Sequence, residues 1–347
     1  MRPQKPVLNS LVVMLTGTGF LLYWHSSNDN AYAILVMIDF LLMNNLECKR
    51  STTPLEGIRM SVSLDLRISF CLLPIELPVF NPIALELLQL LGDPGTDIDA
   101  IVATINEDQA LSAQVLKMAN SAAFSGLTRS ETIKDSAVRL GARQITNLAM
   151  AASQAALHTS NNPIVNDVMQ DLWLHSHACA LGCRSLARKA GHPELAEQAY
   201  MAGLLHDIGK LYILKAMEQI SQNEESRVVL TRELILGVFS EMHVELACRL
   251  MDHWNIPPVY RAIVADHHSE HVDSTNTLLV IVRLVNVNSR RLHLSLNPAL
   301  FHTDDVLPEI NALRMDESLW TNLEESMTGD ENTGSTPATQ PKAERFT

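Results

Sequence analysis

Apolar residues recur at helical spacing along most of the chain from Leu73 onward. Ile98, Ile101, Val102 and Ile105 are separated by three, four and seven residues, so they share one face of a helix that Asp97 can cap. Similar spacing predicts helices over residues 83–91, 109–119, 141–157, 168–190, 196–208, 229–238, 241–254, 257–267 and 277–290. No segment in this part alternates long enough to predict a sheet. The pattern therefore predicts an all-α fold.

Short polar connections separate these predicted helices. Gly92-Asp93-Pro94-Gly95 is a strong stop and turn, and Asn161-Asn162-Pro163 and Gly191-His192-Pro193 are further examples. Connections this short favour helices that pack against their neighbours in the sequence. The last residues, 328–347, are polar and nearly without branched apolar side chains, so we expect a disordered tail.

Residues 1–70 have a different character. Leu8 to Trp24 is an uncharged run of 17 residues, and Ala31 to Met43 is a second apolar run interrupted only by Asp39. These lengths lie at or below the lower limit of a membrane span. Three interpretations stay open: a membrane anchor or signal peptide, a buried structural hairpin, and a poorly folding extension upstream of a true start at Met60. Membrane association is expected only if residues 1–59 are translated.

Composition narrows the class of protein. Of 347 residues, 47% are hydrophobic and 19% charged, which excludes a disordered or fibrous chain. There are 26 Lys+Arg against 39 Asp+Glu, and the net charge of −13 argues against nucleic acid as a partner. Five scattered cysteines without a CxxC pair indicate neither a disulfide framework nor a zinc knuckle. A reducing, cytoplasmic location fits best.

A His-Asp pair gives the strongest indication of chemistry. His206 and Asp207 end an apolar helical segment, and such a helix would not carry a carboxylate inward without a partner. Candidates for further metal ligands are His175, His243, His267 and His268. Imidazoles with one carboxylate suit Fe, Mn, Zn or Ni. Asp207 as a simple hydrogen-bond acceptor is the alternative.

The other isolated histidines and the cysteine pair have plainer interpretations. A single helical histidine is more often a satisfied polar residue than a ligand, and this applies to His192, His253, His271, His293 and His302. Cys179 and Cys183 stand four residues apart on a predicted helix, where small apolar core filling is expected.

Several separated motifs carry a family resemblance over about residues 71–290. AGLLHDIGK, with LWLHS upstream and ADHH downstream, resembles the HD superfamily of metal-dependent phosphohydrolases, and HDIGK is similar to the HD-GYP phosphodiesterases. The preceding half narrows the match. INEDQAL, LKMANSAAF and AVRLG, followed later by EMHVELA and WNIP, resemble the HDOD family, the HD-related output domain of bacterial signalling proteins.

The resemblance implies a mostly non-catalytic output or scaffold module, often linked to cyclic-di-GMP. The enzyme branch would need a metal site made by His175, His206, Asp207, His243, His267 and His268 with a final Asp. That last position reads Asn286, a weaker ligand because its amide oxygen carries no formal charge. The GYP element is also missing after His267-His268. Both departures argue against hydrolysis.

Three functional hypotheses follow. In a hydrolase, Asp207 would orient the attacking water and Lys210 would stabilise charge developing on oxygen. A site with a single metal would instead sense metal or bind nucleotide without turnover. In an interaction module the histidines would be structural, and Phe124 would be a core residue.

We predict a non-catalytic bacterial signal-transduction module, an output or scaffold domain that acts through protein or nucleotide binding. The alternatives are a metal-dependent phosphodiesterase of the HD type and a single-metal sensor. Its expected partners are signalling proteins or a cyclic dinucleotide. No cofactor is expected other than a divalent Fe, Mn or Zn ion, whose binding stays open. The predicted organisation is an apolar extension (1–70), an HDOD domain (71–295) with a helical N-terminal lobe (71–160) and an HD-like lobe (163–295), a C-terminal extension (296–327) and a tail (328–347).

Overall fold

The structure is a computed structural model that describes residues 12–16, 19–23, 70, 80–90, 97–124, 129–222, 228–270, 273–296 and 307–328. Contacts divide the chain into two units, Met1–Ile58 and Arg59–Thr347. The predicted turn at Gly92–Gly95, the tail beyond Thr328 and most of residues 1–70 lie outside the described residues, so those predictions stay untested.

The first unit contains a two-stranded antiparallel hairpin. Strands β1 (Val12–Thr16) and β2 (Gly19–Tyr23) pair with Val12 opposite Tyr23, and both lie inside the apolar run Leu8–Trp24. Within the described residues, no helix is both long enough and apolar enough to cross a membrane.

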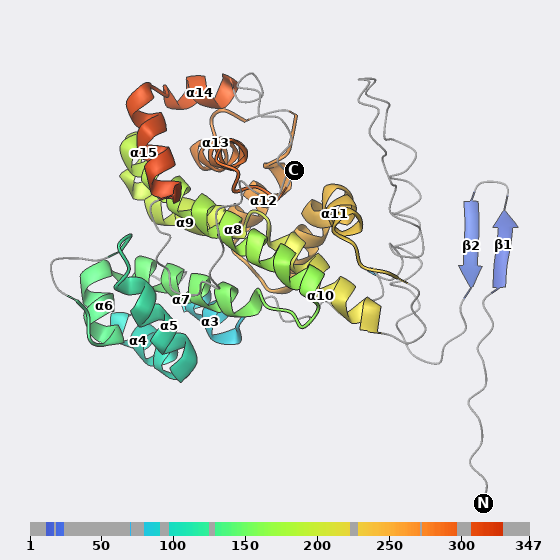
Figure 1. Ribbon diagram of the computed structural model, residues 1–347, viewed down its shortest axis with the longest axis horizontal. Helices are drawn as coiled ribbons and strands as arrows, with labels where there is room; N and C mark the ends of the chain where they lie inside the picture. The colour runs from blue at the N-terminus through green and yellow to red at the C-terminus, as the bar shows by residue number, and fades with distance from the viewer. Residues whose placement is uncertain are drawn as a thin grey trace, which may run out of the picture. The chain divides into compact units, whose positions relative to one another are not determined.

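The second unit is built from helices, and the predicted all-α fold is confirmed there. Apart from β1 and β2, the regular elements that the structure describes are helical (Figure 1). The helices are α3 (Pro82–Leu90), α4 (Ile98–Asn106), α5 (Gln109–Ala119), α6 (Ile133–Leu140), α7 (Ala142–Leu157), α8 (Pro163–Lys189), the 3₁₀ turn η1 (Pro193–Leu195), α9 (Ala196–Leu205), α10 (Ile208–Gln222), α11 (Arg232–His253), α12 (Pro258–Asp266), α13 (Thr277–Arg291), α14 (Leu307–Leu313) and α15 (Glu317–Thr328).

Local sequence explains the longest helix. Asn162 caps α8 by accepting hydrogen bonds from the backbone N–H groups of Ile164 and Val165 at 3.0 and 3.2 Å, and Pro163 stands at the first helical position. Arg188 and Lys189 lie in the last turn, where positive charge is favourable. The helix therefore begins five residues before the predicted start at residue 168.

Two predicted boundaries were wrong. The segments 229–238 and 241–254 form one continuous helix, α11, because the Ser240 hydroxyl bonds back to the Gly237 carbonyl and does not interrupt the helix. The segment 196–208 is broken, since α9 ends at Leu205 and α10 begins at Ile208.

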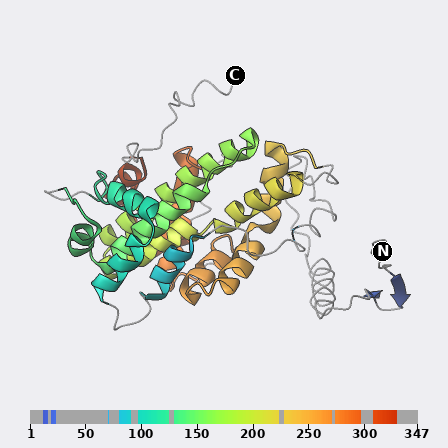
Figure 2. The same cartoon turned by 90° about the horizontal axis from the view of Figure 1, so that it is seen from below.

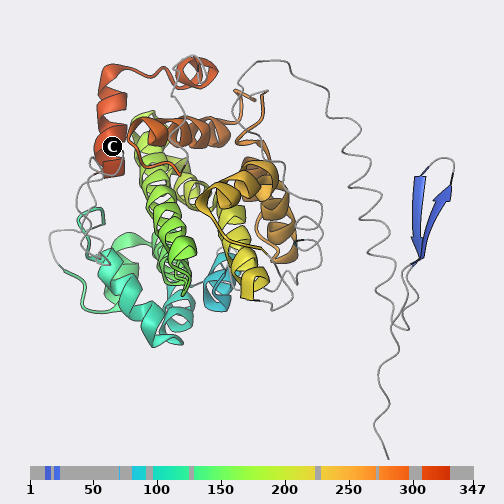
Figure 3. The same ribbon diagram turned by 45° about the vertical axis from the view of Figure 1, so that its right-hand side comes forward.

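Helix α8 is the centre of the packing. It contacts α9 along its length and also α7, α10, α11, α13 and α15. The N-terminal helices α3–α7 gather on one side of α8, and α13–α15 lie on the other (Figures 1 and 3). The view from below shows α8 running through the second unit (Figure 2). Its buried residues extend from Val165 to Ala187, so side chains on this helix reach every part of the core.

The core has two apolar clusters. One extends from α3 to α12, and the other joins α8 and α9 to α12–α15. Phe124, expected to be a core residue, is 5% exposed and meets Tyr200 edge-on with ring centroids 6.1 Å apart.

Candidate metal centre

His206 and Asp207 occupy the break between α9 and α10, and both are buried. Two glycines let neighbouring helices approach this break. A Cβ added at Gly209 would lie 2.0 Å from the carbonyl oxygen of His243, and one added at Gly203 would lie 2.7 Å from that of Cys179. Any larger residue at Gly209 would push α10 away from α11, so the motif HDIGK needs its glycine for helix packing.

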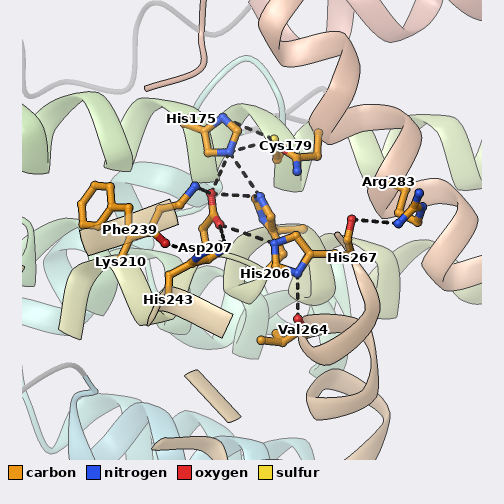
Figure 4. Close-up of polar contacts among 12 residues, drawn as sticks. His175, Cys179, His206, Asp207, Lys210, Phe239, His243, Val264, His267 and Arg283 are labelled. Atoms are coloured by element: carbon orange, nitrogen blue, oxygen red, sulfur yellow. Dashed lines mark hydrogen bonds and ion pairs between the residues drawn. The ribbon is translucent and has the colours of Figure 1, made fainter. Parts of the chain in front are cut away.

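Histidines from four segments surround the Asp207 carboxylate (Figure 4). Oδ2 lies 3.2 Å from Nε2 of His175 on α8 and 3.3 Å from Nε2 of His206. Oδ1 lies 3.7 Å from Nε2 of His243 on α11 and 3.6 Å from Nε2 of His267, which follows α12. The fold thus brings together five of the six predicted ligands, the Asp207 carboxylate and the four histidines that face it.

Backbone carbonyls fix how three of the rings are oriented. Nδ1 lies within hydrogen-bond distance of a carbonyl three or four residues earlier for His206 with Gly203 (2.8 Å), His243 with Phe239 (2.6 Å) and His267 with Val264 (2.7 Å). A carbonyl only accepts, so Nδ1 must carry the proton and donate it. A neutral imidazole then presents the lone pair of Nε2 toward Asp207. Metal-binding histidines are commonly oriented in this way.

Burial keeps the imidazoles neutral and charge keeps the carboxylate ionised. Desolvation lowers the pKa of His175 and of His243 to about 4, and it also lowers the pKa of His267. Burial alone would raise the pKa of Asp207, but the Lys210 ammonium holds it well below its usual range. Lys210 Nζ donates to Asp207 Oδ2 at 2.6 Å.

The second oxygen of the Asp207 carboxylate, Oδ1, lacks a hydrogen-bond donor. Asp207 Oδ1, His243 Nε2 and His267 Nε2 are buried without hydrogen-bond partners, although they face one another. A buried polar atom left unpaired costs about 1–3 kcal/mol, and three converging lone pairs also repel one another. A cation placed among them would remove both costs.

The spacing also fits a metal ion. Two ligand atoms that are each about 2.1 Å from one ion lie roughly 3.0–3.4 Å apart, depending on the angle between them. The separations from Asp207 to the four histidines are 3.2–3.7 Å. Nitrogen ligands with one carboxylate match Zn, Fe or Mn. The residues present therefore fit a divalent metal ion.

The remaining predicted residues lie at the edge of this cluster or outside it. His268 is exposed, and its ring centroid lies 5.1 Å from that of His243, so it can join the set from the solvent side. Asn286 is buried on α13. Cys179 packs in the second apolar cluster as expected, yet its Sγ lies 3.8 Å from Nδ1 of His175. Burial raises the pKa of this thiol, so it stays protonated.

Sequence reasoning missed a clamp on the segment that carries His267. Arg283 of α13 donates to the carbonyls of Asp266, His267 and Ser269 at 3.2, 3.1 and 2.8 Å. Asp266 is the last residue of α12, and carbonyls at a helix end lack partners within the helix. The Asp266 carbonyl also accepts the Ser269 N–H at 2.9 Å. Arg283 Nε also donates at 2.5 Å to Glu309 of α14, which is fully buried. No local pattern marks this pair, because its partners are 26 residues apart.

Among the described residues, no other histidine contributes a ligand atom to the cluster. His192, His253 and His293 lie on described segments elsewhere, while His271 and His302 lie outside the described residues.

Comparison with known proteins decides the family. The family model of the HDOD domain matches residues 77–270, more than half of the chain. The chain belongs to the HDOD family. An uncharacterized protein of Treponema pallidum (strain Nichols) is 24% identical over 275 residues, which are 76% of this chain and 51% of that protein. The chain thus spans about half the length of this curated relative.

Solved structures share the HDOD fold. A protein of Shewanella amazonensis, whose name proposes a metal-dependent phosphohydrolase, matches with a TM-score of 0.56 and 20% identity over 76% of this chain and 96% of its own. An HDOD protein of unknown function from Geobacter sulfurreducens matches with a TM-score of 0.53 and 22% identity, over 73% of this chain and 84% of its own. A proposed signal transduction protein of Marinobacter aquaeolei matches with a TM-score of 0.55 and 18% identity, over 88% of this chain and 65% of its own. At these identities the likeness supports the fold alone.

Proposed function

We propose that this HDOD protein is a regulatory module of bacterial signal transduction whose C-terminal lobe binds one divalent metal ion without hydrolysing a phosphodiester. The observation that carries the metal assignment is the convergence of Asp207 Oδ1 with Nε2 of His243 and of His267, three buried acceptors without a donor. Signalling proteins are the proposed partners, and the bacterial cytoplasm is the proposed location.

Asp207, His243, His267 and His268 form one group of ligand atoms that would hold the ion, with His268 at its exposed edge. His175 and His206, which lie near Cys179, face the other oxygen of Asp207 and would complete the site. A bound ion would supply positive charge to a site where the Lys210 ammonium now neutralises one carboxylate oxygen only. Because the ligands come from α8, α11, the α9–α10 break and the end of α12, occupancy would tie these segments together. That is how a binding event here can change a surface elsewhere.

Three observations favour regulation over hydrolysis. A hydrolase would use Asp207 to orient water and Lys210 to stabilise charge on the phosphate, but the two groups are paired with each other at 2.6 Å. Asn286 stands where the HD enzymes that the motifs resemble have an Asp, which removes an anionic ligand. Apart from His268, the ligand histidines are also buried, which restricts access for a phosphodiester.

The test is metal content of the full chain, purified without nickel affinity. We expect about one Fe, Mn or Zn per chain, as for a structural site with several protein ligands. Asp207→Asn keeps the size of the side chain but removes the charge, so it should lose most of the metal, whereas the control His253→Gln should retain it. Wild type that is folded and metal-free, and stays so after incubation with Mn²⁺ or Zn²⁺, would contradict the assignment.

Hydrolysis is tested on the same metal-loaded protein. Cyclic-di-GMP and bis(p-nitrophenyl) phosphate are the substrates, and release of product is measured by chromatography and absorbance. Our proposal expects no turnover above that of Asp207→Asn. Turnover that disappears in Asp207→Asn would replace the regulatory function with a phosphodiesterase. Retention of intact cyclic-di-GMP by the wild type would identify a cyclic dinucleotide as the signal.

A further inference from the structure

A cleft of about 370 Å³ opens where three parts of the fold meet, away from the metal centre. Its walls are the last turns of α8, the Ala122-Ala123 turn after α5, and Glu325 and Ser326 of α15. Figure 1 shows α15 beside the end of α8, with the N-terminal helices below it. The volume lies near the lower end of the roughly 300–1,000 Å³ typical of small-molecule sites.

The lining of this cleft is basic although the chain carries a net charge of −13. Arg184, Arg188 and Lys189 contribute three cations to the lining, and Glu325 contributes one carboxylate. Glu197 pairs with Arg188 from beside the cleft, so one positive charge is in excess. Ser185 adds a hydroxyl that can donate a hydrogen bond. Like charges gathered on one wall repel one another, and an anion bound between them would relieve this repulsion.

Two of the cations are held in place by the protein. Arg184 is buried, donates to the Ala123 carbonyl at 3.1 Å, and stacks 4.0 Å above the centre of the Phe124 ring. Arg188 donates at 2.9 Å to Glu197, which in turn accepts from the Asn147 side chain at 3.0 Å. A guanidinium fixed in this way loses little side-chain entropy when it binds a ligand.

We propose that this cleft binds a small phosphate ester, of the size of a single nucleotide. A phosphate monoester is an anion at neutral pH, so the excess of positive charge on the wall attracts it. Guanidinium groups bind phosphate oxygens with paired hydrogen bonds, and the serine hydroxyl adds a donor. The apolar surface of Ala122, Ala123 and Leu181 accommodates the organic part.

A ligand here would contact both lobes and the C-terminal extension at once. It would also act on the helix that carries a metal ligand, since His175 and Arg184 are nine residues apart on α8, or about 13 Å along its axis. The cleft does not depend on the metal centre for its own geometry. It is therefore tested independently of the proposed function.

The probe is AMP, with adenosine and succinate as comparison ligands, titrated into the full chain in EDTA and followed by calorimetry. We expect AMP to bind at least about tenfold more tightly than adenosine, because a charged hydrogen bond contributes at least that much. Arg188→Gln combined with Lys189→Gln should weaken AMP binding at least about tenfold. Arg143→Gln removes one exposed positive charge on α7 outside the cleft and should leave binding unchanged.

Further variants locate the phosphate. Arg184→Lys keeps the charge but loses the planar fork, so it should weaken AMP binding several-fold while circular dichroism stays unchanged. Asp207→Asn should bind AMP like the wild type, which separates the cleft from the metal centre. Equal affinity for AMP and adenosine, for AMP and succinate, or for AMP in the wild type and the double variant would overturn the proposal. Absence of AMP binding by the wild type, or its loss in Asp207→Asn, would do the same.

Discussion

Substitution of Glu309 by glutamine should weaken both the fold and the metal centre. The Glu309 side chain is fully buried, and its Oε1 accepts the Arg283 Nε–H at 2.5 Å. The Arg283 side chain is 11% exposed and ends at the carbonyls that follow α12. Glutamine keeps the length and an accepting oxygen but removes the charge. Arg283 then becomes a buried cation balanced only by carbonyl dipoles.

The size of the effect follows from the burial of the pair. Breaking a buried ion pair by removing one partner costs about 3–5 kcal/mol. Glutamine preserves a neutral hydrogen bond worth about 1 kcal/mol, and the carbonyl contacts of Arg283 remain. We therefore expect Glu309→Gln to lower the free energy of unfolding by about 2–3 kcal/mol. At about 2–4 °C per kcal/mol for a domain of this size, Tm should fall by roughly 4–12 °C.

The assay is a double-mutant cycle by urea unfolding of wild type, Glu309→Gln, Arg283→Met and the double variant. A direct pair should show a coupling energy of about 2 kcal/mol. Glu317→Gln, an exposed glutamate on α15, is the matched control and should stay within about 0.5 kcal/mol of wild type. Since Arg283 also holds the His267 carbonyl, Glu309→Gln should weaken Mn²⁺ binding as well. A Tm within about 1 °C of wild type, with coupling below about 0.5 kcal/mol, would refute the clamp.

Two further predictions concern burial and helix packing. Burial lowers the pKa of His158 to about 4, whereas this histidine titrates near pH 6.5 in the unfolded chain. The contribution of His158 to stability should therefore fall by about 1.5 kcal/mol from pH 6.5 to 5, and His158→Gln should reduce the slope of stability against pH in urea unfolding by up to one proton. A slope unchanged in that variant would assign the pH dependence to other groups. Gly209→Ala would place a Cβ 2.0 Å from the His243 carbonyl oxygen, so we expect the free energy of unfolding, followed by thermal melting, to fall by more than about 3 kcal/mol and the metal content to fall as well. Stability equal to that of the wild type would show that α10 and α11 separate at low cost.

Periodicity predicted where most helices lie because apolar spacing follows directly from how a helix buries one face. Asp97 caps α4 as expected, with its side chain accepting the backbone N–H of Asp99. The pattern failed where burial surrounds a helix. The apolar character continues through the break at His206 and Asp207, since both sides of it are in the core, so residues 196–208 were predicted as one helix.

The motifs predicted the residues of the cluster but not its electrostatics. A sequence shows that histidines and a carboxylate are present, and the family resemblance suggests that they meet. It does not show that Lys210 binds one oxygen of Asp207 while the other faces His243 and His267 without a donor. That asymmetry arises from side-chain directions, which local spacing leaves undetermined. It is also what distinguishes a site that fits a cation from a closed hydrogen-bond network.

The functional unit extends beyond the region that defines the family. The family match ends at residue 270, directly after His267 and His268, yet Arg283 and Glu309 hold the backbone of that segment from α13 and α14. The basic cleft likewise includes α15 as one wall. Removing residues 307–328 should therefore disturb the metal centre and the cleft together. Arg283, which holds the His267 segment, would lose its counter-ion Glu309, and the cleft would lose the wall formed by α15. The C-terminal helices therefore support the cluster around Asp207 through Arg283 and form one wall of the cleft.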